Sequence, residues 1–356
     1  MEEQDARRVS LRGWGGVAAM AVAVVCALVA VFTVLTPLSH SAGGDGSTGL
    51  GSGGVADGVQ ARADDCAPDV KGEEPERSLD PGKGSQNGDA VKAIKDRGYL
   101  LVGVDQNSYR WGYRDPNKGL DSDGSVGKEA TSELEGFDID LAHEIAGEIL
   151  GDPTSVHFRA IPTNQRIPAI KSGQVDMVVR TMTISCQRLK DVAFSTAYFQ
   201  TGQQVLAPKA SDIDGYDTSL GGKRICSAKG STAELALTHD REKGTIPNSA
   251  DIATTVPNQL DCLVRLQLGE VDAVVTDGAL AASQAAQDPT VELKGKPFTK
   301  EFYGVAMKKG ADDLVRRVNQ VLEDYRKSGG GWQASYDKWL EPALGPSSGP
   351  PAPKYK

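Results

Sequence analysis

The sequence lacks several patterns that would assign it to a common class of protein. It has only four histidines and five cysteines, with no CxxC pair and no Cys/His cluster, so we expect no metal site. Its formal net charge of −9 argues against nucleic acid as a partner, because phosphate binding needs a basic face. No nucleophile–base pair is apparent, since His143, His157 and His239 fall outside the polar motifs described below. We therefore expect a protein without catalytic residues or a cofactor.

Long uncharged runs are also scarce, and the clear one lies near the N-terminus. Residues 17–38, VAAMAVAVVCALVAVFTVLTPL, carry no charge and follow Arg7, Arg8 and Arg12. A bilayer span needs about 20 apolar residues, whereas the apolar core of a signal peptide has about 7–15. Since arginines that precede a span stay inside, we expect residues 1–38 to form a cytoplasmic tip and a single-pass anchor in the cell membrane. The remainder would be extracellular. A cleaved signal peptide is the alternative.

Four of the cysteines lie in the part of the chain that would be exported, where an oxidising environment favours disulfides. The preferred pairing is Cys226 with Cys262 and Cys66 with Cys186. In the chain-entropy model, closing a loop of the size between Cys226 and Cys262 stabilises a fold by about 4 kcal/mol.

Segments of biased composition flank the rest of the chain. Residues 39–63 are rich in Gly, Ser and Asp, which predicts a flexible extracytoplasmic linker, and we extend this linker over 39–88. At the other end, residues 341–356 form a Pro-rich tail that we expect to be extended, because proline disfavours helix. A polar insertion at 114–136 predicts a surface loop, and its acidic residues lack the spacing of a calcium-binding EF-hand loop.

Between these segments, strand-like and helix-like patterns alternate. The segment FDIDLAHEIAGEIL, 137–150, has apolar residues at helical spacing. This alternation is typical of parallel α/β sheets. The segments that read as short buried strands are 99–104, 156–161, 175–180, 224–228, 272–276 and 303–309.

A weak internal repeat suggests two similar lobes. The segments IPAIKSGQVDMVV (167–179) and LVRLQLGEVDAVV (263–275) both read as a helix, a glycine and a Val-Val strand. Any helix–Gly–strand unit would look alike, which is the simpler explanation. However, Arg180-Thr181 follows the first copy and Thr276-Asp277 the second, and open α/β sheets bind ligands at the carboxyl ends of their strands. Two such ends facing each other would form a cleft between the lobes.

The polar residues at these ends suit a free amino acid. Arg188 would form a forked pair with its carboxylate, and Asp277 would accept its ammonium. The turn Gly230-Ser231-Thr232 starts a helix, where backbone N–H groups attract anions, although an ordinary Ser/Thr cap is the simpler reading. Simpler roles also exist for Arg188, as a surface ion pair with Asp191, and for Arg166, on a solvated helix face. Thr183 and the Ser231–Thr232 turn would take the remaining hydrogen bonds of the amino acid. Extra arginines at positions 166 and 180 suggest a second carboxylate on the ligand.

At this point the chain resembles a known family. From about residue 90 to 340 it is similar to the amino-acid solute-binding proteins of ABC transporters, family 3, the glutamine/glutamate-binding type with actinobacterial members. Four cysteines also resemble those of actinobacterial glutamate-binding relatives, which supports the pairing above. The motifs that carry the resemblance are GFDIDLAHEIA (136–146), QRIPAIKSGQVDMV (165–178), TMTISCQRLKDVAFS (181–195), KGSTAELA (229–236) and VDAVVTD (271–277).

The resemblance implies a periplasmic-binding-protein-like α/β fold, with two α/β lobes joined by a two-strand hinge. Lobe 1 would comprise 89–202 plus 300–340, and lobe 2 would comprise 206–296. The crossings between them would fall near 203–206 and 296–302.

The resemblance also implies roles for single residues. Arg188 matches the arginine that binds the α-carboxylate, and Asp277 matches the ammonium ligand. Thr181 and Thr183 match hydroxyl or backbone contacts to the carboxylate, as do Ser231 and Thr232 from lobe 2. Phe137 matches an aromatic wall, and Arg166 lies where binders of acidic amino acids contact the side-chain carboxylate.

The chain departs from the family pattern in two places. The first loop, 105–115, lacks the pattern of the glutamine-specific proteins, so Tyr109 or Trp111 would take an aromatic role. Arg180 replaces a small residue, and would either reach the distal carboxylate of the ligand or pair with a nearby acid. The candidate ligands are therefore glutamate, aspartate, glutamine and asparagine.

The leading hypothesis is binding without turnover by a membrane-anchored monomer that delivers the amino acid to an ABC permease. A sensor that signals through a membrane partner to a kinase is the alternative. A dehydratase-like enzyme on the same fold and a pure interaction module without a ligand are further alternatives.

Overall fold

The computed structural model describes residues 74–115, 134–327 and 331–356, all within one compact unit, Val55–Lys356. The predicted anchor, residues 39–73 of the predicted linker with Cys66, and residues 116–133 of the predicted insertion lie outside the described residues. None of the helices in the described ranges is long and apolar enough to cross a membrane.

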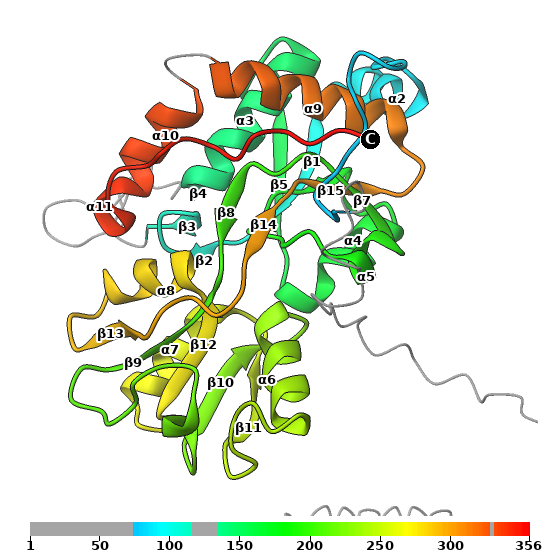
Figure 1. The fold of residues 1–356 in the computed structure, drawn as a ribbon. Helices are drawn as coiled ribbons and strands as arrows, with labels where there is room; N and C mark the ends of the chain where they lie inside the picture. The colour runs from blue at the N-terminus through cyan, green and yellow to red at the C-terminus, as the bar shows by residue number, and fades with distance from the viewer. Residues whose placement is uncertain (1–73, 116–133, 328–330) are drawn as a thin grey trace, which may run out of the picture. The chain divides into compact units, whose positions relative to one another are not determined.

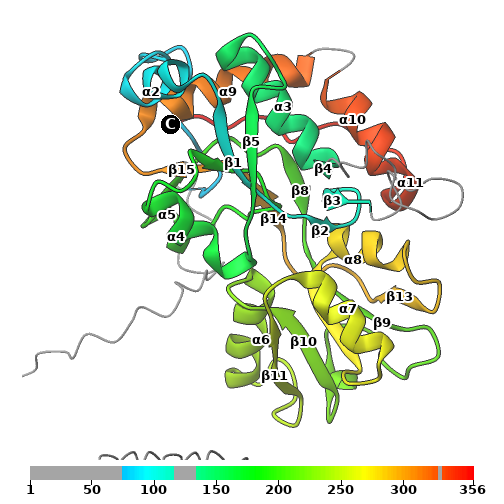
Figure 2. The same ribbon diagram turned by 180° about the vertical axis from the view of Figure 1, so that it is seen from behind.

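The first lobe is built around a mixed five-stranded sheet. β1 (Leu100–Val104) pairs in parallel with β5 (Val156–Ala160) and β6 (Met177–Val178). β15 (Ala306–Lys308) runs antiparallel to β6 and to β7 (Val192–Phe194), which gives the order β5-β1-β6-β15-β7. α3 lies against β1 and β5 (Figure 2). The helices of this lobe are α2 (Asp89–Arg97), α3 (Phe137–Leu150), η1 (Thr163–Gln165), α4 (Arg166–Lys171), α5 (Cys186–Leu189), α9 (Asp312–Lys327), α10 (Trp332–Trp339) and α11 (Glu341–Leu344).

The second lobe has a sheet of the same size. β10 (Arg224–Ala228) lies parallel to β11 (Asp251–Val256) and β12 (Ala273–Asp277). β9 (Gln203–Pro208) runs antiparallel to β12 and β13 (Val291–Lys294), so the order is β11-β10-β12-β9-β13. Its helices are η2 (Thr218–Leu220), α6 (Thr232–Glu242), α7 (Gln259–Gln267) and α8 (Gly278–Ala285).

Two short strands connect the lobes. β8 (Phe199–Thr201) leads from lobe 1 into lobe 2, and β14 (Glu301–Tyr303) leads back. They pair antiparallel and run side by side between the two sheets (Figure 1). The first crossing lies one strand earlier than expected, because residues from Gln203 onward already belong to the sheet of lobe 2. A small antiparallel sheet of β2 (Asn107–Ser108), β3 (Gly112–Arg114) and β4 (Leu134–Glu135) completes lobe 1.

Both copies of the predicted repeat form a helix, a glycine and a strand. The first copy contains α4 and β6, and the second contains α7 and β12. The connecting glycines, Gly173 and Gly269, have φ of 73° and 68°, a region that side-chain-bearing residues rarely adopt.

Of the three predicted elements 137–150, 175–180 and 303–309, one is confirmed and two differ from the sequence pattern. The helix at 137–150 is confirmed with both of its ends. The predicted strand 175–180 pairs only over Met177–Val178. The predicted strand 303–309 is divided in two, because the chain leaves the hinge ladder after Tyr303 and joins the lobe 1 sheet only at Ala306.

The last part of the predicted linker and the Pro-rich tail are packed on lobe 1 and on each other. Ser78 is only 2% exposed, and its hydroxyl donates to the Phe194 carbonyl at 2.6 Å. Its backbone N–H donates to the Lys354 carbonyl at 3.0 Å, and Lys356 donates back to the Ser78 carbonyl at 2.9 Å. The expectation of a flexible linker through residue 88 was therefore wrong around Ser78, since both backbone groups of this residue are bonded to the tail. The tail also begins later than expected, after the short helix α11.

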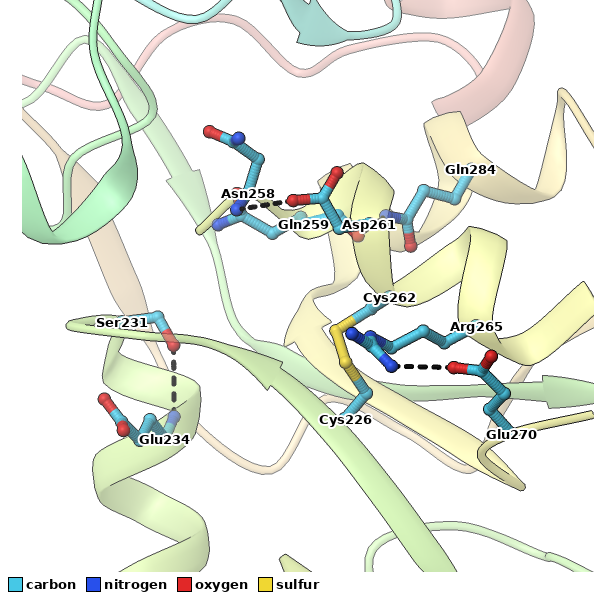
Figure 3. Close-up of a disulfide and its surroundings, with 10 residues drawn as sticks. All are labelled: Cys226, Ser231, Glu234, Asn258, Gln259, Asp261, Cys262, Arg265, Glu270 and Gln284. Carbon is cyan, nitrogen blue, oxygen red and sulfur yellow. Dashed lines mark hydrogen bonds and ion pairs between the residues drawn. A yellow bond between two sulfur atoms is a disulfide. The ribbon is translucent and has the colours of Figure 1, made fainter. Parts of the chain in front are cut away.

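The predicted disulfide between Cys226 and Cys262 is confirmed. It joins β10 to α7, with Cα atoms 5.6 Å apart and both side chains fully buried (Figure 3). Cys186 is also disulfide-bonded, but its predicted partner Cys66 lies outside the described residues, so that pairing stays a prediction.

We expect the double variant Cys226→Ala/Cys262→Ala to have a free energy of unfolding lower by up to about 4 kcal/mol, because the unfolded chain regains the entropy of an open loop. Thermal and denaturant unfolding of the purified protein would measure the change. Ser227→Ala, which removes a small buried side chain from the same strand, is the matched control. Equal midpoints for the double variant and the control would contradict the prediction.

Candidate functional site

The predicted polar site residues are all buried where the two lobes meet. Lobe 1 contributes them from α4, from the loop after β6 and from α5, and lobe 2 contributes them from the start of α6 and the end of β12. None has more than 7% of its surface exposed. These residues are Arg166, Arg180, Thr181, Thr183, Arg188, Ser231, Thr232 and Asp277.

Arg188 extends from lobe 1 to lobe 2. The Ser185 side chain caps α5 and accepts from the backbone of Arg188, which fixes the start of the helix. One guanidinium nitrogen donates to the Thr183 carbonyl at 2.7 Å, and the other donates to the Gly230 carbonyl at 3.2 Å. Burial lowers the pKa of Arg188 to about 10, while the nearby charges of Glu301 and Asp277 act in the opposite direction. The surface ion pair with Asp191 is excluded, since Asp191 pairs with Lys171 at 2.6 Å.

Asp277 ends β12 and is the N-cap residue of α8. Its carboxylate accepts hydrogen bonds from the Gln203 amide and the Tyr303 hydroxyl. Burial and the charge of Glu301 raise the pKa of Asp277 to about 7, whereas the Tyr303 hydrogen bond and the charges of Arg188 and Arg166 lower it. The carboxylate thus lies in the same buried cluster as the guanidinium that the sequence paired with it.

Glu301 and Gln203 belong to this cluster, and our reading of the sequence missed both. Glu301 is 2% exposed and accepts from the Thr183 hydroxyl at 2.5 Å and the Thr232 hydroxyl at 2.9 Å. Gln203 donates to Thr232 at 2.9 Å and to Glu301 at 3.0 Å. A signal was present, because residues two apart on a strand share a face, and the polar side chains of 299, 301 and 303 therefore point the same way.

Of the two contacts predicted for Arg180, the structure shows the pair with a nearby acid. Its guanidinium forms an ion pair with Asp105 at 2.8 Å and donates to the Thr163 hydroxyl at 3.0 Å. It also donates to the Asn258 side chain at 2.9 Å, at the N-cap of α7 in lobe 2. Arg180 therefore pairs with a nearby acid and at the same time connects the two lobes.

Arg166 is buried rather than on a solvated helix face, with 3% of its surface exposed. Its guanidinium donates to the backbone carbonyls of Thr163 at 2.9 Å and Arg180 at 3.3 Å. Burial lowers the pKa of Arg166 well below its usual value, and the neighbouring charges of Arg188 and Arg180 add to this effect. Among the described residues, the hydrogen bonds of Arg166 thus go to neutral groups, which leaves its positive charge without a directly bonded carboxylate.

The aromatic residues form a fully buried cluster beside the hinge. Trp111 packs edge-on against Phe137, Phe199 and Tyr303, with ring centroids 5.6, 4.9 and 5.7 Å away. Its indole N–H donates to the Ser283 hydroxyl in lobe 2 at 3.2 Å. Tyr109 packs instead against Tyr113, so Trp111 is the aromatic of the first loop that joins Phe137.

Thr181 has a strained backbone that a buried acid holds in place. Its φ of 40° lies in the left-handed region, which is unfavourable for a β-branched residue. Its N–H donates to Asp138 at 2.9 Å, and the other oxygen of Asp138 accepts from the Tyr198 hydroxyl at 2.8 Å. Burial raises the pKa of Asp138 to about 7 despite these hydrogen bonds.

The turn at Gly230 brings lobe 2 close to lobe 1. The Ser231 side chain is an ordinary helix cap that accepts from the Glu234 N–H at 3.1 Å (Figure 3). Gly230 has φ of 77°, and a Cβ built on it would lie 3.0 Å from the Cα of Asn164 in lobe 1. Only glycine fits both the backbone conformation and this close approach. No group of three or more residues suited to a metal ion occurs among the described residues.

Comparison with known proteins identifies the family. The model of the bacterial extracellular solute-binding proteins, family 3, matches residues 100–342. The chain belongs to this family. The resemblance to the amino-acid solute-binding proteins of family 3 is thereby confirmed. The expected periplasmic-binding-protein-like α/β fold with two lobes is confirmed as well. As a solute-binding protein it is not an enzyme.

Individual relatives resemble this solute-binding protein over most of their length. A glutamine-binding protein of an ABC transporter from Bacillus subtilis (strain 168) is 34% identical over 253 residues, which cover 71% of this chain and 85% of that protein. A glutamate-binding protein from Corynebacterium efficiens is 27% identical over 276 residues, 74% of this chain and 85% of that protein. The crystal structure of a solute receptor for L-cysteine from Neisseria gonorrhoeae matches with a TM-score of 0.62 and 27% identity. It covers 72% of this chain and 95% of its own.

We expect Gly230→Ala to weaken amino-acid binding about tenfold, because the new methyl group would press on the Asn164 backbone when the lobes meet. Gly222→Ala is the matched control. It has a similar φ of 71° but nothing within 4 Å of the added Cβ. Both variants should lose about 1–2 kcal/mol of stability to backbone strain, and only the first should lose affinity. Calorimetry and thermal unfolding measure the two effects, and equal affinities would contradict a contact between lobes at this glycine.

Proposed function

We propose that this protein binds glutamate or aspartate, or one of their amides, between its two lobes. The observation that carries the proposal is the burial, where the lobes meet, of a guanidinium from lobe 1, Arg188, and a carboxylate from lobe 2, Asp277, each of which shifts the pKa of the other. A free amino acid is the small molecule that offers a carboxylate to the first group and an ammonium to the second. The names of the glutamine-binding and glutamate-binding relatives support this class of ligand.

Arg166 supports a ligand with a polar or acidic side chain. Its charge is buried and its hydrogen bonds go to backbone carbonyls, while Asp277 and Asp105 act on it without a hydrogen bond, so a ligand carboxylate would be the first acid bonded to it. Arg180 is already neutralised by Asp105, which makes it a poorer candidate for the same role. Trp111 and Phe137 would support the site from behind as part of the buried aromatic cluster.

Binding would favour the arrangement in which the lobes touch. Arg188 and Arg180 each donate to a group of lobe 2, at 3.2 and 2.9 Å. A ligand that contacts both lobes has more interactions in this arrangement than with the lobes apart, so it shifts the population toward it. The closed form is what a membrane partner would then recognise.

The proposed setting is the outer face of the cell membrane. Residues 17–38 would anchor the chain, with the binding domain outside, and the closed monomer would deliver its amino acid to an ABC permease. The glutamine-binding relative belongs to such a transporter.

We expect Arg188→Ala to abolish stabilisation by every amino acid, because the α-carboxylate loses its charged partner. In the wild type, ligand at 100 times its dissociation constant should stabilise the fold by about 2.7 kcal/mol.

Arg166→Met should weaken the binding of glutamate and aspartate more than the binding of glutamine and asparagine, since only the acids present a second charge. A thermal-shift screen over the twenty amino acids measures both effects. Arg224→Ala, which removes an exposed arginine paired with Asp272, is the control. Equal losses for acids and amides would contradict the side-chain role of Arg166.

We expect the full-length chain to capture an ABC permease from solubilised membranes when glutamate or glutamine is present, and Arg188→Ala to capture much less. Affinity purification followed by mass spectrometry measures this, and protease treatment of intact cells tests whether the domain lies outside. Capture of a kinase-linked membrane protein in place of a permease would favour the sensor alternative. A domain that resists protease on intact cells would contradict the proposed location.

A further inference from the structure

Glu301 is a buried acid that the predicted site did not include. It lies on the hinge strand β14, and its carboxylate is held from both lobes. One oxygen accepts from the hydroxyls of Thr183 in lobe 1 and Thr232 in lobe 2, at 2.5 and 2.9 Å. The other accepts from the Gln203 amide at 3.0 Å and the Thr299 hydroxyl at 3.3 Å. A charged group at the hinge is thus connected to the same hydroxyls that the sequence assigned to the ligand.

The direction of these hydrogen bonds limits what the hydroxyls can bind. A carboxylate only accepts, and a hydroxyl has one proton and two lone pairs. The Thr183 and Thr232 hydroxyls therefore both donate their protons to Glu301, so they present only lone pairs to a ligand. Lone pairs can accept from an ammonium, but they cannot donate to a carboxylate. The polar surface around Glu301 consequently suits the positive end of a zwitterion.

Glu301 is also close to Asp277. The same Gln203 nitrogen donates to one oxygen of each carboxylate, so the two acids lie on either side of a single N–H₂ group. Two buried carboxylates this close repel each other. A cation placed beside both would offset this repulsion, whereas an anion would add to it.

We propose that Glu301 and Asp277 together form a two-carboxylate receptor for the α-ammonium of the bound amino acid. In this arrangement Glu301 determines specificity: it supplies one of the charges, and it makes the Thr183 and Thr232 hydroxyls acceptors. Arg188 then receives the α-carboxylate without help from the Thr183 hydroxyl. The receptor would select ligands with an ammonium and reject their desamino analogues. This inference rests on the proposed amino-acid function.

The affinity should depend on pH through Asp277. The groups that face it are Glu301 and Tyr303 from β14, Gln203 from β9, Arg188 from α5 and Arg166 from α4. With its pKa raised to about 7, Asp277 is largely protonated at pH 6 and must lose that proton to accept an ammonium. The dissociation constant of L-glutamate should therefore be about tenfold larger at pH 6 than at pH 8.

Calorimetric titration with L-glutamate, L-glutamine and glutarate at pH 6 and pH 8 tests the proposal. Glutarate is glutamate without its ammonium. We expect the wild type to bind the amino acids and to reject glutarate. Glu301→Gln should weaken binding of the amino acids about tenfold or more at pH 8, because it removes one charge and places an N–H₂ donor opposite the donating Gln203 amide. It should also reduce the difference between the two pH values, because the pKa of Asp277 falls when the neighbouring charge is removed. Glu292→Gln, a carboxylate on β13 paired with Lys294, should behave as the wild type.

The inference is overturned if Glu301→Gln binds as tightly as the wild type, or more tightly, or keeps the full pH dependence. If circular dichroism shows that this variant does not fold, the titrations of the wild type test the inference. An affinity of the wild type that does not change with pH, or tight binding of glutarate, would also overturn the inference. Glu301→Asp, which keeps the charge on a shorter side chain, should retain more affinity than the glutamine variant. If neither the wild type nor Glu292→Gln binds any of the twenty amino acids, the proposed function itself fails and the inference with it.

Discussion

The structure depends on how charges are buried where the two lobes meet. A guanidinium and a carboxylate that lose their water are destabilising unless each finds opposite charge and hydrogen-bond partners nearby. Arg188 has hydrogen bonds to two backbone carbonyls, one from each lobe, and Asp277 accepts from Gln203 and Tyr303. The opposite charge comes from Glu301 and Asp277 for the guanidinium, and from Arg188 and Arg166 for the carboxylate. Each charged group thus requires the other lobe or the hinge to be in place. Contact between the lobes consequently also stabilises the buried charges of the site.

The hinge is part of this arrangement rather than a passive connection. β14 carries both the Glu301 carboxylate and the Tyr303 hydroxyl, and the ring of Tyr303 also packs against Trp111 and Phe199. A bend at this strand would therefore move two groups of the site together with the aromatic cluster. The side chains of this connecting strand thus belong to the site itself.

The sequence predicted the parts of this arrangement that local patterns encode. The helix at 137–150 follows from its apolar spacing, and the burial of Asp277 follows from its position at the end of β12. The alternation of polar residues at 299, 301 and 303 was a local signal, but it does not show what Glu301 faces, because β8 and β14 are three-residue strands whose pairing joins residues about a hundred positions apart. Asp105 and Asp138 were missed for a different reason. An acid just after a strand or at the start of a helix looks like an ordinary turn or cap, and only the folded chain shows that each one faces a buried group.

The pairing of Ser78 with the tail has a mechanical consequence. The segment that enters the domain and the segment that ends it are joined by backbone hydrogen bonds on the same lobe, while the other lobe is an insertion reached through β8 and β14. Tension applied to either end of the described chain is thus carried by lobe 1 alone and bypasses the strands that bend. Force on the chain ahead of residue 74, or a fusion partner added after residue 356, would therefore not hinder the movement of one lobe relative to the other.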